Sequence, residues 1–311
     1  MPVSLRAGAC RAPCRSIDRF LVPSTADNRG VPPSTVDNRR KPQKPLRTAS
    51  AMPFADLSDV RLHYQLDGDP SLPVLVLSNS LGTNFDMWQP QIAAFTQHFR
   101  VLRYDTRGHG RSSVPAGPYT VAQLGGDVIA LLDALQIERA HFCGLSMGGI
   151  TGMWLGLNHA ARLNKLVLCN TAAYIGPPEN WTNRAAAVER DGVGSIAAAV
   201  VDRWLTPDFA AAHPELVQEL RAMLGATDAA GYAANCRAIR DNDLRADIHR
   251  IAVPTLVIAG SGDIPTPPSD GRYMAETIPG ASYVELEAAH LSNLQQVERF
   301  TQAVVDFLTG A

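Results

Sequence analysis

The chain has 311 residues, of which 46% are apolar and 19% are charged, and its formal net charge is −2. This is enough chain for one large α/β domain or two smaller ones, and no apolar stretch is long enough to span a membrane. The five cysteines are odd in number and irregularly spaced, which argues against a disulfide framework or a zinc site. We expect no metal and no cofactor. Cys143 and Cys169 fall in apolar runs, as expected for buried thiols in the reducing cytoplasm.

Residues 1–51 form a basic segment without a sustained helix or strand period. They hold ten lysines and arginines against three aspartates, a net charge of +7, which leaves −9 for residues 52–311. The segment also repeats itself, at 23–29 and again at 33–39. Such a composition buries too little apolar surface to offset the entropy of ordering the chain. We expect a disordered extension without a catalytic role, followed by an acidic domain that is a poor candidate for nucleic-acid binding.

Three interpretations of this extension stay open. It fits a disordered basic arm, an arginine-rich organelle-targeting peptide, or a leader that is read as protein because the start codon was assigned too early. A secretory signal fits badly, because no long apolar core follows the first arginines. The first regularly patterned segment opens at Met52, and this favours the third interpretation.

Strand and helix patterns alternate through the rest of the chain. In chain order they predict strands at 60–66 and 74–77, a helix at 87–99, a strand at 101–104, a helix at 120–135, a strand at 140–143, a helix at 150–157, strands at 163–168, 254–259 and 281–286, and a helix at 295–308. Thr120 and Gln123 form the capping box of the second helix, which Gly125 and Gly126 weaken by about 1 kcal/mol each. This alternation predicts a mostly parallel sheet with helices on both faces.

Residues of about 172–250 interrupt this alternation. They are alanine-rich, helical by pattern and without a strand, and they lie between two predicted sheet strands. An insertion of this size at the carboxyl edge of a sheet would cover an active site there. We interpret it as a helical lid.

The run Gly144-Leu145-Ser146-Met147-Gly148 is a G-x-S-x-G motif between a predicted strand and a predicted helix. This context is typical of a nucleophile elbow, in which a strained turn exposes the serine hydroxyl above the sheet. Strand and helix approach so closely there that side chains at Gly144 and Gly148 would collide. Ser146 is therefore the predicted nucleophile.

A serine hydroxyl needs a base to take its proton. Asp263 comes just after the predicted strand at 254–259, and His290 just after the strand at 281–286. Because reactive groups gather at the carboxyl ends of strands, Ser146, Asp263 and His290 can converge despite their separation. Their order along the chain is the one expected for this architecture, and it predicts a catalytic triad with His290 as base and Asp263 orienting it.

The oxyanion that forms on attack needs two fixed N–H donors. The Met147 amide is one candidate, at the start of the helix after the elbow. The second is expected from the loop after the strand at 74–77, with the Ser80 amide first and the Leu81 amide next. His109, in the run Arg107-Gly108-His109-Gly110, is interpreted as a residue that braces its loop.

These motifs make residues 52–311 resemble the α/β-hydrolase superfamily. Within it the sequence looks like the 3-oxoadipate enol-lactonases, on the runs 78–83, 104–110, 142–149, 170–173 and 181–184. The resemblance implies an α/β-hydrolase fold and hydrolysis of 3-oxoadipate enol-lactone to 3-oxoadipate in aromatic catabolism, the β-ketoadipate pathway. It also implies a cation under the lid for the substrate's carboxylate. Arg184 is the candidate, with Trp181 as an apolar wall.

Alternatives on the same scaffold remain. The chain could be another carboxylesterase, thioesterase, C–C hydrolase or perhydrolase, since the elbow and triad do not identify a substrate. It could also be a receptor that binds a small lactone with little turnover. The expected partner in each case is a small lactone or ester, and neither a membrane nor a nucleic acid. The sequence leaves the oligomeric state open.

Overall fold

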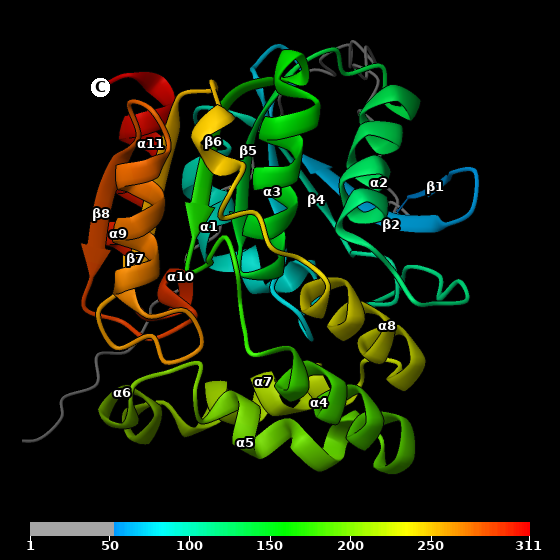
Figure 1. Cartoon of the computed structure of the whole chain (residues 1–311). Coiled ribbons are helices and arrows are strands. Elements are labelled where there is room, and N and C mark those ends of the chain that lie inside the picture. The colour runs from blue at the N-terminus through cyan, green and yellow to red at the C-terminus, as the bar shows by residue number, and fades with distance from the viewer. Residues whose placement is uncertain (1–52) are drawn as a thin grey trace, which may run out of the picture. The chain divides into compact units, whose positions relative to one another are not determined.

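The computed structural model describes residues 53–311, so the expectations for residues 1–51 lie outside the described residues. Eight strands form one sheet in the order β1-β2-β4-β3-β5-β6-β7-β8 (Figure 1). The strands are β1 (Phe54–Asp56), β2 (Arg61–Asp67), β3 (Val74–Ser78), β4 (Arg100–Tyr104), β5 (Ala140–Leu145), β6 (Leu163–Cys169), β7 (Thr255–Gly260) and β8 (Ser282–Leu286). The strand β1 was not predicted, because three residues are too few to show a period.

The sheet is parallel from β4 to β8, and only β1 and β2 at one edge run antiparallel to their neighbours. The central strands β3, β5 and β7 are buried along most or all of their length, as their continuous apolar sequences require. Parallel strands place all their carboxyl ends at one edge of the sheet. The segments that follow β3, β5, β6, β7 and β8 therefore meet there.

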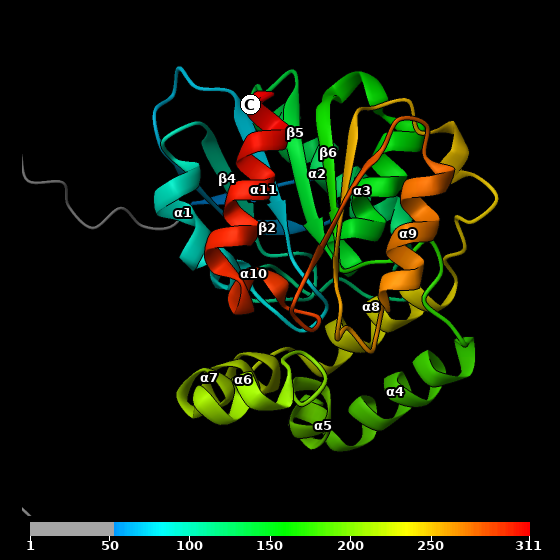
Figure 2. The same cartoon turned by 90° about the vertical axis from the view of Figure 1, so that its left-hand side faces the viewer.

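Helices cover both faces of the sheet. They are α1 (Gln89–Phe95), α2 (Val121–Ala134), α3 (Met147–Asn158), α9 (Pro268–Thr277), α10 (Ser292–Gln295) and α11 (Val297–Thr309), with the 3₁₀ turns η1 (Phe85–Trp88), η2 (Ala160–Arg162) and η4 (Ile248–Arg250). Helix α1 packs against α11 on one face, and α2 packs against α3 on the other (Figure 2). Helix α9 lies on the same face of the sheet as α3, because both helices contact η4. Within residues 53–311, none of the helices combines the length and apolar character that crossing a membrane requires.

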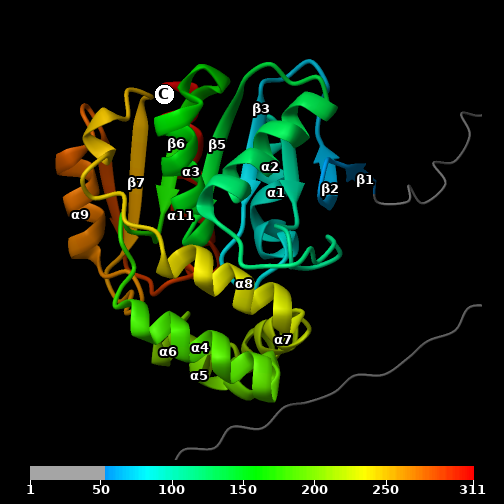
Figure 3. The same ribbon diagram turned by 45° about the vertical axis from the view of Figure 1, so that its right-hand side comes forward.

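The insertion between β6 and β7 is helical. It contains α4 (Pro178–Asp191), η3 (Val193–Ile196), α5 (Ala197–Val201), α6 (Pro207–Ala212), α7 (Pro214–Gly225) and α8 (Ala229–Arg240). Helix α4 packs along α8, and α5 packs against α7. The group lies beyond the carboxyl ends of the strands (Figures 1 and 3). The predicted fold class, a mostly parallel sheet flanked by helices with a helical lid inserted between late strands, is confirmed.

Two predicted helices differ from the structure. The helix expected at 87–99 is the 3₁₀ turn η1 followed by α1, which ends at Phe95. Pro90 cannot donate an intrahelical hydrogen bond, so it sits in the first turn of α1 rather than inside a longer helix. The closing helix expected at 295–308 is α11, which begins two residues later, at Val297, because Gln296 leaves the helical conformation with φ −126° and ψ 53° and separates it from α10.

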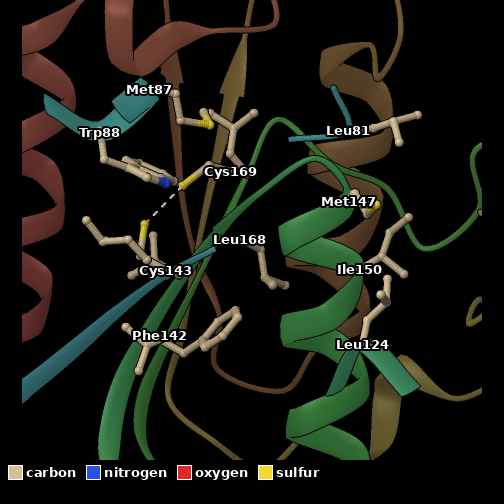
Figure 4. Packing of buried hydrophobic residues seen from close by; sticks show 14 of the residues in the cluster. Leu81, Met87, Trp88, Leu124, Phe142, Cys143, Met147, Ile150, Leu168 and Cys169 are labelled. Atoms are coloured by element: carbon tan, nitrogen blue, oxygen red, sulfur yellow. Dashed lines mark hydrogen bonds between the residues drawn. The ribbon is translucent and has the colours of Figure 1, made fainter. Parts of the chain in front are cut away.

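Below the elbow, successive side chains of β5 and β6 point to opposite faces of the sheet, as strand geometry requires. Phe142 and Leu168 point toward α3, whereas their neighbours Cys143 and Cys169 point toward Trp88 on the opposite face (Figure 4). The two thiols lie with Sγ atoms 3.7 Å apart and are completely buried. Both faces of β5 and β6 are thus packed directly below Ser146.

The two adjacent glycines of α2 have opposite structural roles. A Cβ on Gly125 would lie 2.0 Å from the Trp154 ring of α3, whereas a Cβ on Gly126 would meet no atom within 4 Å. Gly125 thus permits the close contact of α2 with α3, and Gly126 only weakens the helix.

We expect Gly125→Ala to lower the free energy of unfolding by about 1–3 kcal/mol through overpacking. The matched change Gly126→Ala should raise it by up to about 1 kcal/mol, because alanine is the better helix former. Urea unfolding of the two variants beside the wild type measures both effects. Equal shifts in the same direction would show that the contact with Trp154 is not the reason for Gly125.

Candidate active site

Ser146 stands at the sharp turn between β5 and α3. Its backbone adopts φ 58° and ψ −114°, a strained conformation for a residue with a side chain. Two hydrogen bonds hold the turn: the Ser146 amide donates to the Cys169 carbonyl at 2.9 Å, and the Thr171 hydroxyl donates to the Ser146 carbonyl at 2.8 Å. The end of β6 and the segment just after it therefore fix the strained turn through both the amide and the carbonyl of the serine.

The glycines on either side of Ser146 sit where backbones nearly touch. A Cβ on Gly144 would lie 2.1 Å from the Gly148 carbonyl oxygen, and one on Gly148 would lie 2.3 Å from the Ser78 carbonyl oxygen. Real Cβ atoms do not approach backbone this closely. As expected from the sequence, a side chain at either position would collide with the backbone, and this accounts for the spacing of the two glycines in the motif.

Asp263 and His290 meet beside this turn. Asp263 follows β7 and His290 follows β8, and the Nδ1 atom of His290 lies 2.9 Å and 3.1 Å from the two Asp263 carboxylate oxygens. Both side chains are almost fully buried. Ser146 and His290 line the same pocket. Ser146 is thereby gathered at one edge of the sheet with two groups that lie more than 100 residues further along the chain.

The Asp263 carboxylate is held in its ionised form. Burial alone would raise its pKa, but the positive charge of His290 and hydrogen bonds from His290, Thr266 and Asn170 outweigh burial and lower the pKa below 3.8. An ionised carboxylate only accepts hydrogen bonds, so the facing Nδ1 of His290 carries the proton. In the neutral form of the ring, this leaves Nε2 as the basic nitrogen.

Asn170 and Thr266 are site residues that the motifs did not reveal. The Asn170 side-chain amide donates to Asp263 Oδ2 at 3.0 Å, and it is itself fixed by the Ser292 hydroxyl at 2.5 Å. Thr266 donates to the same carboxylate from its backbone amide at 3.0 Å and from its hydroxyl at 2.8 Å. The signal for Asn170 was its place at the end of β6, where a polar residue follows a buried strand.

The loop after β3 has one amide between Ser80 and Thr83 without a protein acceptor. The Ser80 amide donates to the buried Met87 Sδ at 3.4 Å. The amides of Gly82 and Thr83 donate to His109 Nε2 and to the Ser80 carbonyl. Of these four consecutive residues of the described chain, Leu81 is the one whose amide has no protein acceptor. The geometry therefore favours Leu81 over Ser80, the first choice from sequence, as the partner of Met147.

The Met147 amide belongs to the first residue of α3, where an N–H has no intrahelical acceptor. The positive end of the helix dipole lies at the same point. Ser80, Leu81 and Ser146 all line the pocket, so the loop after β3 and the start of α3 face each other across the serine. Two convergent N–H donors can stabilise a negative oxygen there.

His109 braces the loop after β3. Burial lowers its pKa to about 4, so the ring is neutral near pH 7. Its Nε2 accepts from the Gly82 amide at 2.9 Å, and its ring packs against Tyr232 of the lid, with ring centroids 6.5 Å apart. His109 therefore lies outside the triad and connects the loop beside Ser146 to α8.

The pocket above Ser146 encloses about 680 Å³, including the part that opens to solvent. Its floor is formed by Ser146 and His290, and its roof by lid residues that include Trp181, Arg184 and Trp204. Trp181 is fixed by a hydrogen bond from its indole N–H to the Ile175 carbonyl. The structure thus brings Trp181 and Arg184, both singled out from sequence, to the same cavity as the nucleophile.

Arg184 lies over the Trp181 ring, with its guanidinium carbon 4.8 Å from the ring centroid, and it lines the pocket together with Tyr232. A second cation, Arg203, lines the same pocket and was not identified from the sequence. Burial lowers the pKa of Arg203, and the nearby charge of Arg184 lowers it further. No sequence motif marks Arg203, because it is one of many arginines in a helical segment.

The described residues hold no cluster of three or more histidine, cysteine, aspartate or glutamate side chains suited to a metal ion. What residues 53–311 do provide is an alcohol, an imidazole with a basic nitrogen, a buried carboxylate and two N–H donors. That set can carry out acyl transfer from an ester to water.

Comparison with known proteins agrees with this chemistry. Residues 73–297 match the model of the α/β-hydrolase fold family. The 3-oxoadipate enol-lactonase 2 of Acinetobacter baylyi is 48% identical over 246 residues, which cover 79% of this chain and 92% of that protein. The crystal structure of the enol-lactonase from Burkholderia xenovorans LB400 is 51% identical with a TM-score of 0.82, covering 83% of this chain and all of that one.

A more distant solved structure extends the comparison. A thermophilic esterase from Thermogutta terrifontis, solved with malate bound, is 30% identical with a TM-score of 0.78 and covers 83% of this chain and 98% of that one. The elbow, the strand order and these matches together lead to one assignment: the chain belongs to the α/β-hydrolase family.

Proposed function

We propose that this chain hydrolyses 3-oxoadipate enol-lactone to 3-oxoadipate, a step of the β-ketoadipate pathway of aromatic catabolism. The observation that carries the proposal is one pocket in which Ser146 and His290 face a lid arginine. The curated and solved enol-lactonases that resemble this chain at 48% and 51% identity support the choice of substrate. The substrate combines a reactive ring ester with a free carboxylate. The pocket offers Ser146 for the ester and Arg184 for the carboxylate.

Acylation begins when the Ser146 hydroxyl attacks the ring carbonyl carbon and passes its proton to Nε2 of His290. The carbonyl oxygen becomes an oxyanion, which the Leu81 and Met147 amides stabilise by hydrogen bonds. Removal of one such donor typically costs about 10²–10³ in kcat, because the donors are fixed before the charge develops. Asp263 stabilises the imidazolium of His290 at this stage and keeps its ring in place.

Ring opening follows as the bond between the acyl carbon and the ring oxygen breaks. The departing oxygen is an enolate, a better leaving group than an alkoxide, and it takes the proton back from His290. The enol then tautomerises to a ketone within the acyl chain, which stays attached to Ser146. Water deprotonated by His290 attacks this acyl-enzyme and releases 3-oxoadipate with its second carboxylate.

Arg184 holds the carboxylate that the substrate brings with it. The guanidinium lies against Trp181 and Tyr232, so its position is fixed before substrate binds. A planar fork of donors suits a carboxylate, and Trp181 supplies an apolar wall for the ring. The lactone would thus be anchored at its acid arm, with its carbonyl over Ser146.

We expect Arg184→Gln to raise KM for the enol-lactone by about tenfold or more, because a charge-assisted hydrogen bond to the acid arm is lost. KM for a neutral phenyl ester should change by no more than about twofold, since that ester has no carboxylate to anchor. Steady-state kinetics on both substrates test the proposal. Arg190→Gln, on the same helix but paired with Asp191, is the matched control and should alter neither value. Equal losses on both substrates in Arg184→Gln would contradict the assignment.

We also propose that the enzyme works in the cytoplasm. The support is that Cys143, Cys169 and Cys236 are all buried free thiols in the described part of the chain. Such thiols are compatible with a reducing compartment.

A further inference from the structure

The lid contains eight arginines between β6 and β7, and most of them are neutralised. Six form ion pairs with nearby carboxylates; they are Arg190, Arg221, Arg237, Arg240, Arg245 and Arg250. Arg184 and Arg203 have no carboxylate partner among residues 53–311, and these two are the lid arginines that line the pocket. The lid therefore neutralises its outward cations and leaves two positive charges facing Ser146.

No carboxylate lines the pocket beside those two charges. Its lining residues include no aspartate or glutamate. Arg203 is partly buried, and the charges of Arg184 and Asp263 both act on it. Arg203 thus lies within electrostatic range of both the other lid cation and the carboxylate of the triad.

Arg203 is also held in place relative to the triad. The carbonyl of the next residue, Trp204, accepts a hydrogen bond at 2.9 Å from the amide of Leu291, which directly follows His290. Two residues further on, Thr206 accepts from the Gln295 side chain at 2.6 Å. These bonds connect the segment after α5 to the loop that carries His290. The backbone that carries Arg203 therefore keeps its position next to the reacting centre.

We propose that Arg203 and Arg184 form a two-cation site for linear dicarboxylates, in which each guanidinium binds one end of the ligand. The inference rests on the proposed function only for the identity of the physiological acid. The enol-lactone carries one carboxylate, and hydrolysis creates a second at the carbon that Ser146 attacked. Arg184 holds the first, and Arg203, on the segment that is hydrogen-bonded to the loop of His290, binds the second as it forms. The product is consequently retained more strongly than the substrate, and related diacids act as competitive inhibitors.

Inhibition by adipate and by hexanoate tests this directly, because the two acids have the same number of carbons and differ by one carboxylate. The reporter reaction is hydrolysis of p-nitrophenyl acetate, a neutral ester. Wild type should bind adipate about tenfold or more tightly than hexanoate, as expected for one additional charge-assisted contact. In Arg203→Gln the preference should fall to about twofold or less, and Arg203→Lys should keep part of it because the charge remains.

Arg221→Gln is the matched control. It removes a lid arginine that pairs with Asp202 outside the pocket, and it should leave the ratio of the two inhibition constants at the wild-type value. Equal inhibition of the wild type by the two acids, or an unchanged ratio in Arg203→Gln, would overturn the two-cation site. Thermal unfolding of each variant checks that it is folded.

The test separates this inference from the proposed function. If the enol-lactone is not a substrate but adipate binds through Arg203, the dicarboxylate site stands and the substrate assignment fails. If the enol-lactone is hydrolysed but adipate has no advantage over hexanoate, the substrate assignment stands and the two-cation site fails.

Discussion

Replacement of Ser146 by alanine is expected to lower the rate of hydrolysis of a chromogenic ester by about 10⁴- to 10⁶-fold. Among the hydroxyl groups that line the pocket, Ser146 is the one at the elbow, beside the start of α3. Alanine also has a Cβ atom, so the backbone strain at φ 58° stays the same in the variant. The loss should appear in kcat, measured by release of the coloured alcohol over many turnovers.

The same measurement distinguishes an enzyme from a receptor that binds lactones. Wild type should complete many turnovers, whereas a receptor would release at most about one equivalent of product. The thermal midpoint of Ser146→Ala should match that of the wild type, since one hydroxyl is lost and the hydrogen bonds of the turn are made by the backbone. A variant that is folded and still turns over at a wild-type rate would remove Ser146 from the mechanism.

Replacement of Asp263 by asparagine should lower kcat by about 10⁴-fold, because His290 adopts the wrong tautomer. Asp263 Oδ2 now accepts from Asn170, from the Thr266 hydroxyl and from His290 Nδ1. An amide NH₂ at that position would donate to Nδ1, so the proton moves to Nε2 and the base is lost. If the amide is flipped, its NH₂ faces the Thr266 backbone N–H instead, and two donors oppose each other. Steady-state kinetics on a chromogenic ester measure the loss.

Asp270→Asn is the matched control for this variant. Burial raises the pKa of Asp270, and the charge of Asp263 raises it further, so the two carboxyl groups are neighbours. Asp270 makes no hydrogen bond to His290 in the described residues, and its replacement should leave kcat within about twofold. A similar large loss in both variants would mean that overall charge, rather than the bond to His290, is responsible.

The pH dependence of the free energy of unfolding gives a second test of the role of Asp263. Its native pKa lies below the ordinary value of 3.8, so its contribution to stability is present above that value and is lost as pH falls through the native pKa. Asp263→Asn lacks this contribution at every pH. The difference in the free energy of unfolding between wild type and variant should therefore be largest near neutral pH and shrink below about pH 4.

The elements that sequence predicted well are those in which a local pattern has a single physical meaning. The buried run Val74–Leu77 could be little else than a central parallel strand, and it is one. Thr120 and Gln123 form the capping box in the structure as the sequence indicated. The elbow glycines were predictable because the motif itself encodes the close approach of two backbones.

The choice between Ser80 and Leu81 could not be made from sequence. Both amides lie in the same loop, and a motif fixes the loop but not the direction of each N–H. That direction follows from a tertiary contact, the hydrogen bond from the Ser80 amide to the sulfur of Met87 in η1. Nothing in the sequence pattern of the loop indicates this partner.

Arg203 was missed for a related reason. It is one of eight lid arginines, and sequence spacing does not tell which of them are paired. Arg221 pairs with Asp202 across 19 residues, and Arg237 pairs with Glu189 across 48. Only the three-dimensional packing of α4 on α8 and of α5 on α7 shows which two cations remain for the pocket. Local patterns thus revealed the chemistry of the site, whereas the groups that choose its substrate depend on packing.

The decay of enol-lactone absorbance in the presence of the wild-type protein tests the central claim most directly. We expect many turnovers with kcat/KM of about 10⁴ M⁻¹ s⁻¹ or more, in the range of ordinary enzymes acting on their own substrates. Ser146→Ala should leave the decay at its rate in buffer. A wild-type protein that cleaves neutral esters but leaves the enol-lactone to decay at the buffer rate would contradict the account.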